Sequence, residues 1–472
     1  MNLLMTRLLL FLFFLPIIVI GQSFSEQLDK DYENYKESSI HNRRFKHKDI
    51  LPLIKSLDVP FIVSKVGESL EGRAIYQVKI GTGATKVLLW SQMHGDEPTA
   101  TMAIMDILNF FATNDELDSY KKTILDNLTL YFIPLLNPDG GEQFRRRTAL
   151  NVDLNRDALR LQTPEGQLLK KIRSQTNADW GFNLHDQSRY NSVGNTNKTA
   201  TISFLAPAYN YEKGINEIRK RAIQQIGLMN ETLQAYMPNH VAKYNDDFEP
   251  RAFGDNIQKW GTSTILIESG GYKNDPEKQF IRKMNFIALL SAFEQIALKK
   301  YANNSLVGYE KLPFNGRYFH ELLIRNVTIR KSGKPYILDI AFRRDELQFN
   351  KNKSFYYQSY ISDLGDLSTY FGYDELDAAG YQIVPGKLYP KTIRSFKKFQ
   401  KLNISEMHRQ GYTDIKIKNL SNEQRKLALP IHLLSEYELF NPVFSLGSNP
   451  SFFLEKNGQK EYLVINGVIF KL

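Results

Sequence analysis

Cysteine is absent from this chain of 472 residues. Disulfide bonds are therefore excluded, and so are zinc sites built on thiolates. Any metal ion that the protein binds must be held by histidine and carboxylate side chains. The search for a metal site is thus restricted to places where these two residue types come together.

The chain also lacks a basic stripe with interleaved aromatic residues, although its net charge is +10 and its pI is near 9.2. The densest basic run has only three residues, Arg145-Arg146-Arg147. We therefore expect no nucleic-acid partner. We interpret the surplus positive charge as an aid to solubility and as a source of attraction to anionic envelope surfaces.

An apolar run, residues 8–20, lies near the amino terminus and follows the positive charge of Arg7. It is shorter than the roughly 20 residues that a membrane span requires. The pattern predicts a signal peptide over residues 1–21, cleaved after Gly21, rather than an uncleaved membrane anchor. We expect a secreted or periplasmic protein with no integral membrane segment after cleavage. An exported protein without cysteine fits a bacterial envelope.

The middle of the chain alternates strand-like and helix-like segments. The composition, 42% hydrophobic and 24% charged, is that of a globular protein with two or three domains. The alternation predicts an α/β fold with a mixed, mainly parallel sheet flanked by helices. We expect strands within residues 62–89, 128–136, 180–184 and 264–267, helices over 99–111, 164–177 and 212–236, and a helix or a packed arm over 23–50.

The character of the sequence changes after Asn303. Tyrosine and phenylalanine become dense, and strand-like runs follow one another. Asn457-Gly458 stands between two apolar runs and predicts a hairpin turn. There is no internal repeat and no low-complexity linker. We therefore expect a first domain over residues 22–303 and a β-rich accessory domain of unknown role over 304–472.

The most informative motif is His94-Gly95-Asp96-Glu97. It follows a strand-like segment and precedes a helical one, so His94 and Glu97 should lie in a turn at the carboxyl end of a strand. Side chains placed in this way can reach one metal ion. Alone, the pair is also typical of surface polar residues. Two ligands are too few for a catalytic zinc ion, which usually takes three and keeps one position for water.

Two further candidates lie at the ends of other strand-like segments. His185 closes the segment 180–184, and in parallel sheets ligands collect at the carboxyl ends of the strands. Glu268 follows the segment 264–267 and precedes two glycines. A glutamate just after a buried strand is costly for structure alone, whereas near a metal ion it is a natural general base for water.

A polar stretch, residues 151–157, supplies another group of candidates. Alternation predicts Asp153 and Asn155 on one side and Leu154 on the other. A carboxylate at Asp153 can orient a metal-bound imidazole from behind. Arg156 with Asn155 can hold a substrate carboxylate in a two-pronged contact. The alternative interpretation is a polar turn with a surface arginine.

Together these motifs resemble the zinc carboxypeptidase family, the carboxypeptidase A-like metallopeptidases. The likeness covers residues 45–300 and leaves the remainder outside it. Each motif is moderately specific, and their order along the chain makes the combination strong. The matching stretches are residues 67–73, His94-Gly95-Asp96-Glu97, Leu136-Asn137-Pro138-Asp139-Gly140, Val152-Asp153-Leu154-Asn155-Arg156, Leu184-His185 and Ile267-Glu268-Ser269-Gly270-Gly271.

The resemblance implies a set of ligands. His94, Glu97 and His185 would bind one zinc ion (Zn2+) per chain, with water in the fourth position. Asp153 would support His94 from behind. Glu268 would take a proton from the zinc-bound water and pass it to the leaving amine.

The resemblance also implies a set of substrate contacts. Asn155 and Arg156 would bind the terminal carboxylate of the peptide. An arginine shortly before that motif would polarise the scissile carbonyl group. Arg146 fits this position best, and Arg147, one residue further, stays an alternative.

The chain departs from the family pattern at three places. Asp96 stands where the pancreatic members carry an arginine, so one substrate contact is missing. The family's mobile tyrosine has only a loose counterpart, Tyr244. Asp255 lies near the family's specificity pocket, where an acid would favour a basic side chain. The alternative for Asp255 is a helix cap or a turn.

The expectation is a secreted zinc metallocarboxypeptidase with its catalytic domain over residues 22–303, acting on peptides that have a free C-terminal carboxylate. One alternative on the same fold is an amidohydrolase that acts on N-acyl amino acids or on peptidoglycan stem peptides. Another is a non-catalytic peptide-binding protein. The last is disfavoured because no expected ligand is missing and the general base is present.

Overall fold

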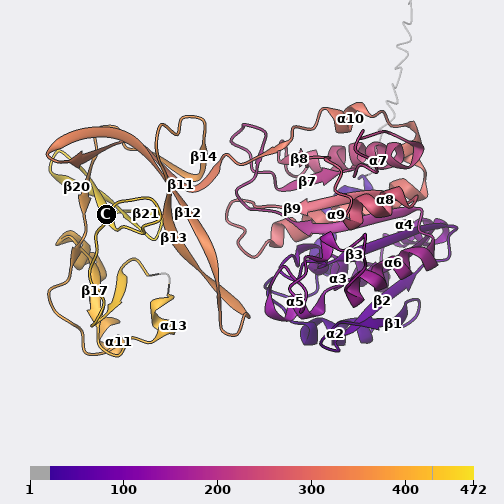
Figure 1. Ribbon diagram of the computed structural model, residues 1–472, viewed down its shortest axis with the longest axis horizontal. Coiled ribbons are helices and arrows are strands. Elements are labelled where there is room, and N and C mark those ends of the chain that lie inside the picture. The colour runs from indigo at the N-terminus through magenta and orange to yellow at the C-terminus, as the bar shows by residue number, and fades with distance from the viewer. Residues whose placement is uncertain (1–21, 428) are drawn as a thin grey trace, which may run out of the picture.

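The computed structural model describes residues 22–427 and 429–472. Figure 1 shows an N-terminal α/β part beside a C-terminal β-rich part, which agrees with the predicted fold class. The predicted signal peptide, residues 1–21, lies outside the described residues. Within the described ranges, no helix combines the length and the hydropathy that a membrane crossing needs.

The N-terminal part is built on an eight-stranded sheet in the order β1-β2-β4-β3-β5-β9-β7-β8. Its centre, β4-β3-β5-β9, is parallel, and β7 runs antiparallel to β9. The mixed, mainly parallel sheet was therefore predicted correctly. The strands are β1 (Ile62–Glu68), β2 (Ala74–Ile80), β3 (Thr85–Ser91), β4 (Leu128–Ile133), β5 (Trp180–Asp186), β7 (Ile202–Leu205), β8 (Val241–Lys243) and β9 (Ser263–Ser269).

Apolar residues of β3 alternate between two cores, one on each face of the sheet. Val87 and Leu89 pack into the larger core, with residues of α3, α7 and α9, while Leu88 and Trp90 pack with α6 and α8. Full burial of each such side chain contributes about 1.5–3 kcal/mol. The helices are α1 (Phe24–Tyr35), α2 (His47–Lys55), α3 (Thr99–Ala112), α4 (Asp118–Asn127), α5 (Pro138–Gln143), α6 (Pro164–Thr176), α7 (Glu217–Gln234), α8 (Phe253–Lys259), α9 (Gln279–Ala297) and α10 (Val307–Glu310).

The amino-terminal segment packs on the body, as expected, through a buried ion pair. Asp106 of α3 and Arg282 of α9 are both fully buried and lie 2.5 Å apart. The hydroxyl group of Tyr32 in α1 donates to the same carboxylate at 2.9 Å. Arg282 also donates to the carbonyl oxygens of Glu37 and Ile40, so this segment completes the hydrogen bonds of a buried charge.

Two polar stretches form short helical segments beside the sheet. Residues 138–143 form the short helix α5, because Asn137 caps it and Pro138 occupies its first position. Residues Leu154–Arg156 form a turn of 3-10 helix, η1, rather than an extended alternating segment, and Asp153 caps it by accepting from the Asn155 backbone. Leu154 is nevertheless buried, as predicted.

The C-terminal part contains a second large sheet in the order β13-β12-β11-β15-β19-β20-β21, with β14 paired to β11, and a small sheet β16-β17-β18. The predicted hairpin is confirmed: Asn457 and Gly458, both with positive φ, join β19 to β20. The strands are β11 (Phe319–Lys331), β12 (Lys334–Phe349), β13 (Ser354–Gly365), β14 (Phe371–Asp377), β15 (Gln382–Pro385), β16 (Lys387–Leu388), β17 (Tyr412–Ile417), β18 (His432–Ser435), β19 (Phe452–Lys456), β20 (Gln459–Ile465) and β21 (Val468–Lys471); short helices are α11 (Phe396–Phe399), α12 (Ile404–Arg409) and α13 (Asn422–Arg425).

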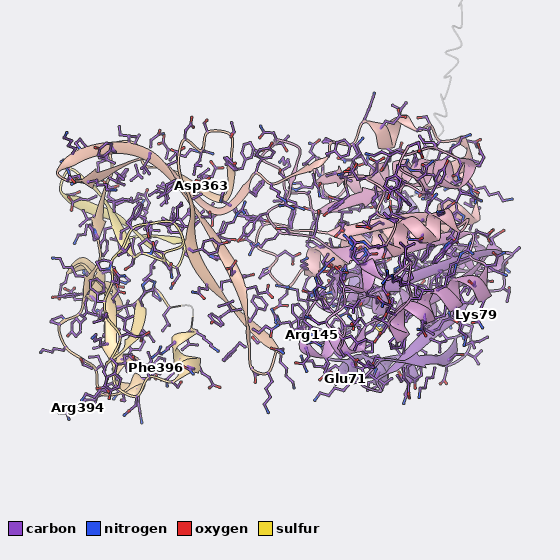
Figure 2. All side chains as sticks on the ribbon, viewed as in Figure 1. Glu71, Lys79, Arg145, Asp363, Arg394 and Phe396 are labelled. Atoms are coloured by element: carbon purple, nitrogen blue, oxygen red, sulfur yellow. The ribbon has the colours of Figure 1, made fainter. Side chains whose placement is uncertain are left out.

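The long β12–β13 hairpin lies along the N-terminal part (Figure 1). Glu346 of β12 pairs with both Arg43 and Arg44 of the amino-terminal segment. Gln348 donates to the carbonyl oxygen of Phe144 at 3.0 Å. The neighbouring Arg145 lies on the side of the N-terminal part that faces the hairpin (Figure 2). The two parts therefore meet through specific polar contacts rather than through a flexible spacer.

Candidate active site

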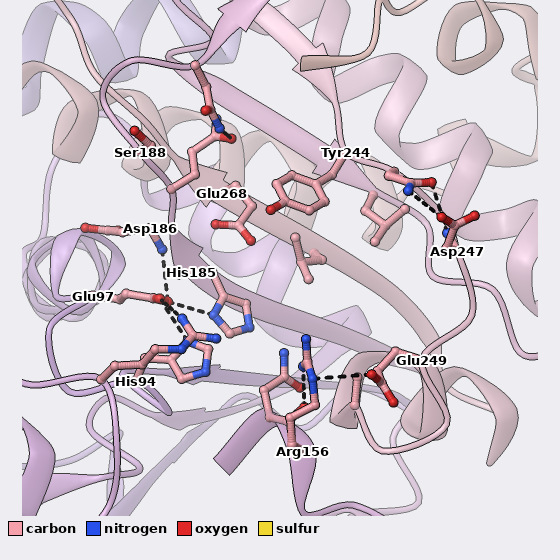
Figure 3. A pocket seen from close by; sticks show the side chains of 18 of the residues that line it. His94, Glu97, Arg156, His185, Asp186, Ser188, Tyr244, Asp247, Glu249 and Glu268 are labelled. Atoms are coloured by element: carbon pink, nitrogen blue, oxygen red, sulfur yellow. Dashed lines mark hydrogen bonds and ion pairs between the residues drawn. The ribbon is translucent and has the colours of Figure 1, made fainter. Parts of the chain in front are cut away.

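A cleft of about 530 Å³ opens at the carboxyl ends of β3, β5 and β9. Figure 3 shows the side chains that line it. The structure brings together nine of the ten site residues expected from the sequence as lining residues, and the tenth, Asp153, contacts His94 from behind. The nine are His94, Glu97, Arg146, Asn155, Arg156, His185, Tyr244, Asp255 and Glu268.

The centre of the cleft is a group of three buried side chains, His94, Glu97 and His185. Nδ1 of His94 lies 2.8 Å from one oxygen of Glu97, and Nδ1 of His185 lies 2.7 Å from the other. One candidate donor atom from each residue lies within 4.8 Å of the other two. Both imidazoles thus present the same nitrogen toward a common carboxylate.

This donor set fits a zinc ion. Two imidazoles and one carboxylate are a combination that catalytic zinc uses, with one position left open. Nε2 of His94, the nitrogen facing away from the group, lies 3.0 Å from Oδ1 of Asp153. A carboxylate in that place fixes the orientation of a metal-binding imidazole and raises its basicity. The fit agrees with the zinc ion expected from the sequence.

The charges in this group hold the ligand carboxylate in its ionised form. Burial alone would raise the pKa of Glu97, but the two flanking imidazoles outweigh burial and keep that pKa below its usual value. Burial alone would lower the pKa of His94. The carboxylates of Glu97 and Asp153 oppose this and raise the pKa of His94 to about 9.

Arg146 reaches into the cleft from the loop after α5. Its Nη1 donates to Glu97 at 3.0 Å and its Nε donates to Asp153 at 3.1 Å, while 43% of its side chain stays exposed. Arg147 turns away and donates to the carbonyl oxygen of Asn151. Of the two arginines left open by the sequence, the structure therefore places Arg146 beside the metal-ligand candidates.

Glu268 lies next to His185 because β5 and β9 are parallel neighbours. His185 and Glu268 are directly paired in the register, so both side chains emerge on the same side of the sheet. Burial, followed by the charge of Glu97, raises the pKa of Glu268 well above its usual value. A bound cation nearby would oppose this shift and favour the ionised carboxylate.

Tyr244 follows β8, and its backbone N–H donates to the carbonyl oxygen of Phe204 at 2.8 Å. Figure 3 shows its ring beside Glu268. Burial and the charge of Glu268 raise the pKa of the Tyr244 phenol. The hydroxyl group therefore remains a hydrogen-bond donor.

Arg156, Asn155 and Asp255 form the end of the cleft near η1 and α8. Nε of Arg156 lies 3.4 Å from Glu249, and 39% of the arginine side chain is exposed. Oδ1 of Asn155 accepts from the Phe253 backbone at 2.9 Å, which leaves its NH₂ group as the donor for a ligand. Asp255 is buried in the first turn of α8 and accepts from the Glu249 backbone. Burial raises the pKa of Asp255 to about 7.

Sequence reasoning missed the opposite wall of the cleft. It consists of Gln187, Ser188 and Tyr190 after β5, together with two arginines, Arg317 and Arg343, from beyond Asn303. The position of the first three directly after His185 was a signal that could have revealed them. The two arginines belong to no motif, and their place depends on how the C-terminal part packs.

Residues 58–199 match the sequence model of the family described as zinc carboxypeptidase. The matched range contains all three metal-ligand candidates, Asp153 and Arg156. Over this range the chain is similar to the zinc carboxypeptidase family. Tyr244 and Glu268 lie beyond the matched range, and the sheet brings them to the same cleft.

Curated carboxypeptidases resemble this chain over short segments. Carboxypeptidase SOL1 of Arabidopsis thaliana is 31% identical over 98 residues, which are 20% of each chain. Carboxypeptidase 2 of Trichophyton rubrum is 27% identical over 103 residues, which are 21% of this chain and 19% of the relative. The chain thus spans about a fifth of the length of these relatives.

Solved structures similar to this chain include a metallo-carboxypeptidase from Burkholderia cenocepacia. Its TM-score is 0.43 at 16% identity, over 54% of this chain and 69% of the other. Carboxypeptidase A from Helicoverpa armigera has a TM-score of 0.42 at 15% identity, over 59% of this chain and 80% of the other.

We expect one zinc ion per chain, lost when His185 is replaced. The substitution His185→Ala leaves two ligands, so it should weaken zinc binding by more than the roughly 10- to 100-fold that loss of a supporting residue causes. Elemental analysis after dialysis at limiting zinc measures the effect. The exposed His41→Ala is the matched control and should keep its zinc. Full zinc content in His185→Ala would show that this ligand assignment is wrong.

Proposed function

We propose that this protein is a zinc-dependent carboxypeptidase that removes the C-terminal residue of peptides. The observation that carries the proposal is the composition of one cleft. It contains a three-ligand candidate metal site, a half-buried general-base candidate at Glu268, and a partly exposed guanidinium group at Arg156. An endopeptidase has no need of the last group, because its substrates have no free carboxylate at the cleavage site.

Arg156 and Asn155 hold the terminal carboxylate of the substrate in this proposal. The planar guanidinium binds a carboxylate in a two-pronged contact. The carboxamide group of Asn155 is fixed by its bond to the Phe253 backbone, so its NH₂ group is ready to donate. Anchoring the chain end in this way sets which peptide bond lies beside Glu268.

Bond cleavage then depends on Glu268 and Arg146. Zinc, when bound, supplies Lewis-acid polarisation and lowers the pKa of water. Glu268 accepts a proton from the attacking water and passes it to the departing amine, so no other proton donor is needed. Arg146 donates to the carbonyl oxygen of the scissile bond, which gains negative charge as water adds.

We also propose that the enzyme acts after export. The support is the charged and apolar pattern of residues 1–21, together with the absence of cysteine. Mass spectrometry of the protein recovered from the periplasm or medium should find the mature amino terminus at Gln22. Retention of residues 1–21 in that material would contradict the proposed cleavage.

Replacing Glu268 should nearly abolish turnover while zinc stays bound. The amide of Glu268→Gln keeps the shape of the side chain but cannot accept a proton. Loss of a general base typically reduces kcat by ~100- to 10,000-fold. Steady-state hydrolysis of a short peptide, with zinc content measured on the same sample, tests this. Near-normal turnover would remove Glu268 from the mechanism.

Blocking the substrate carboxylate and removing Arg156 should cause the same loss. Truncating one partner of a charged contact costs about 2–5 kcal/mol. C-terminal amidation and Arg156→Ala should each reduce kcat/KM, and their combination should add little, since both delete one interaction. Arg160→Ala, an exposed arginine near η1, is the control. Equal cleavage of amidated and free peptides would contradict exopeptidase specificity.

A carboxylate at Asp255 should favour a basic C-terminal side chain in a pH-dependent manner. With a pKa of about 7, Asp255 is mostly neutral near pH 6 and mostly ionised near pH 8. The Lys/Leu ratio of kcat/KM should therefore rise by up to ~10-fold over this range. Asp255→Asn should make the ratio independent of pH.

The free energy of unfolding should fall as pH rises toward 7, whereas the Lys/Leu ratio should rise with pH. The pKa of Asp255 is raised on folding, so its contribution to the free energy of unfolding is lost as pH rises toward 7. Urea unfolding should show that Asp255→Asn removes this decline. A Lys/Leu ratio that is constant with pH in the wild type would leave Asp255 with only its structural bond to Glu249.

A further inference from the structure

Two arginines of the C-terminal part line the cleft that holds the metal-ligand candidates. Arg317 follows β10 (Asn315–Gly316), and Arg343 lies in β12. Neither residue belongs to the segment that matches the zinc carboxypeptidase family. The wall of the cleft is therefore completed by residues outside the range that the family model matches.

The backbone before Arg317 is fixed to the N-terminal part. β10 pairs with β6 (Ser192–Val193), which belongs to the loop after His185. The Gly194 backbone also donates to the carbonyl oxygen of Phe314 at 2.8 Å. Arg317 is thus held at the rim of the cleft by a short ladder rather than carried on a loose linker.

Arg343 is fixed by its own contacts. Its Nη2 donates to the carbonyl oxygen of Phe319 at 3.1 Å, and its guanidinium lies over the ring of Tyr190, 5.1 Å from the centroid. The hydroxyl group of Tyr190 in turn accepts from the Arg344 backbone at 2.9 Å. The guanidinium group of Arg343 therefore contacts the same loop with which β10 pairs.

A partly buried ion pair holds that loop against the C-terminal part. Nη2 of Arg189 lies 3.2 Å from Glu321 of β11, and the Tyr373 hydroxyl donates to the carbonyl oxygen of Arg189 at 2.5 Å. Burial opposes the charge of Arg189, but Glu321 outweighs it and raises the arginine pKa. The wall thus keeps its shape without a bound ligand.

The loop after β5, which Arg343 contacts and with which β10 pairs, lies on the side of Glu268 away from Arg156. In Figure 3, Arg156 and Ser188 lie on opposite sides of Glu268. A peptide anchored by Arg156 at its carboxyl end places its scissile bond beside Glu268. Its preceding residues then run along the wall that contains Ser188, Arg317 and Arg343.

Neither Arg317 nor Arg343 forms an ion pair with a carboxylate in the described part of the chain. The charge of Arg317 extends to the catalytic centre, where it opposes the rise in the Tyr244 pKa that burial and Glu268 cause. Two guanidinium groups without carboxylate partners make a site for an anionic group, and a carboxylate matches their planar donors.

We infer that the C-terminal part supplies a subsite for an acidic side chain upstream of the scissile bond. Arg317 and Arg343 bind that carboxylate and select peptides with aspartate or glutamate before the cleaved residue. The inference rests on the proposed carboxypeptidase function. It gives residues 304–472 a direct role in substrate choice.

The test uses the full-length zinc-loaded protein and matched peptides that carry Glu or Gln at each of three positions upstream of the scissile bond. We expect the wild type to prefer Glu at one position by about 5-fold in kcat/KM, since an exposed ion pair has this order of strength. The preference should fall as salt concentration rises. A Glu/Gln ratio near one at every position would overturn the inference.

Variants separate this subsite from general charge effects. The Glu/Gln ratio should fall to about one in the double variant Arg317→Gln, Arg343→Gln. Arg317→Glu should reverse the preference toward lysine at the same position. Arg330→Gln, at the exposed end of β11, is the matched control and should keep the wild-type ratio. A ratio retained in the double variant would also overturn the inference.

A binding measurement separates failure of the subsite from failure of the proposed activity. Calorimetry with Glu268→Gln measures the affinities of the Glu and Gln peptides without turnover. If no peptide is hydrolysed but the Glu peptide binds about 5-fold more tightly, the activity proposal fails and the subsite stands. Equal or absent binding of the two peptides overturns the subsite.

Discussion

The buried carboxylate of Glu97 is the interaction on which the cleft depends. An ionised carboxylate in a protein interior is strongly unfavourable unless opposite charges and hydrogen bonds surround it. Here His94 and His185 flank its two oxygens, Arg146 donates to one, and the Asp186 backbone donates to the other. These partners come from three separate stretches of the chain, so folding must bring β3, β5 and the loop after α5 together before the charge is satisfied.

The register of the sheet sets the relative positions of these side chains. The directly paired positions of β5 and β9 put His185 and Glu268 side by side, and the turn after β3 adds His94 and Glu97 at the same edge. Successive side chains of β3 point to opposite faces of the sheet. Leu88 and Trp90 pack in one core, and Val87 and Leu89 pack in the other. Packing on both faces thus restricts the polar side chains to the ends of the strands.

Much of this could be predicted from the sequence, and the limits have physical causes. The sequence pattern identifies four site residues because each is a polar residue at or just after the end of an apolar strand: His94, Glu97, His185 and Glu268. The sequence favoured Arg146 but did not exclude Arg147, since adjacent residues in an irregular loop have no fixed periodicity. Residues 154–156 were misread for a related reason: the side chain of Asp153 closes a helical turn that alternation alone does not reveal.

The two-residue pairing of β10 with β6 has a consequence for how such a protein changes over generations. The groups proposed to break the peptide bond lie on one stretch of chain, and two arginines of the wall beside them, Arg317 and Arg343, lie on another. Substitutions at Arg317 and in β12 would therefore change the proposed peptide selectivity without disturbing the candidate metal ligands. Sequence changes in the C-terminal part could thus change the proposed substrate selectivity while the candidate catalytic residues stay the same.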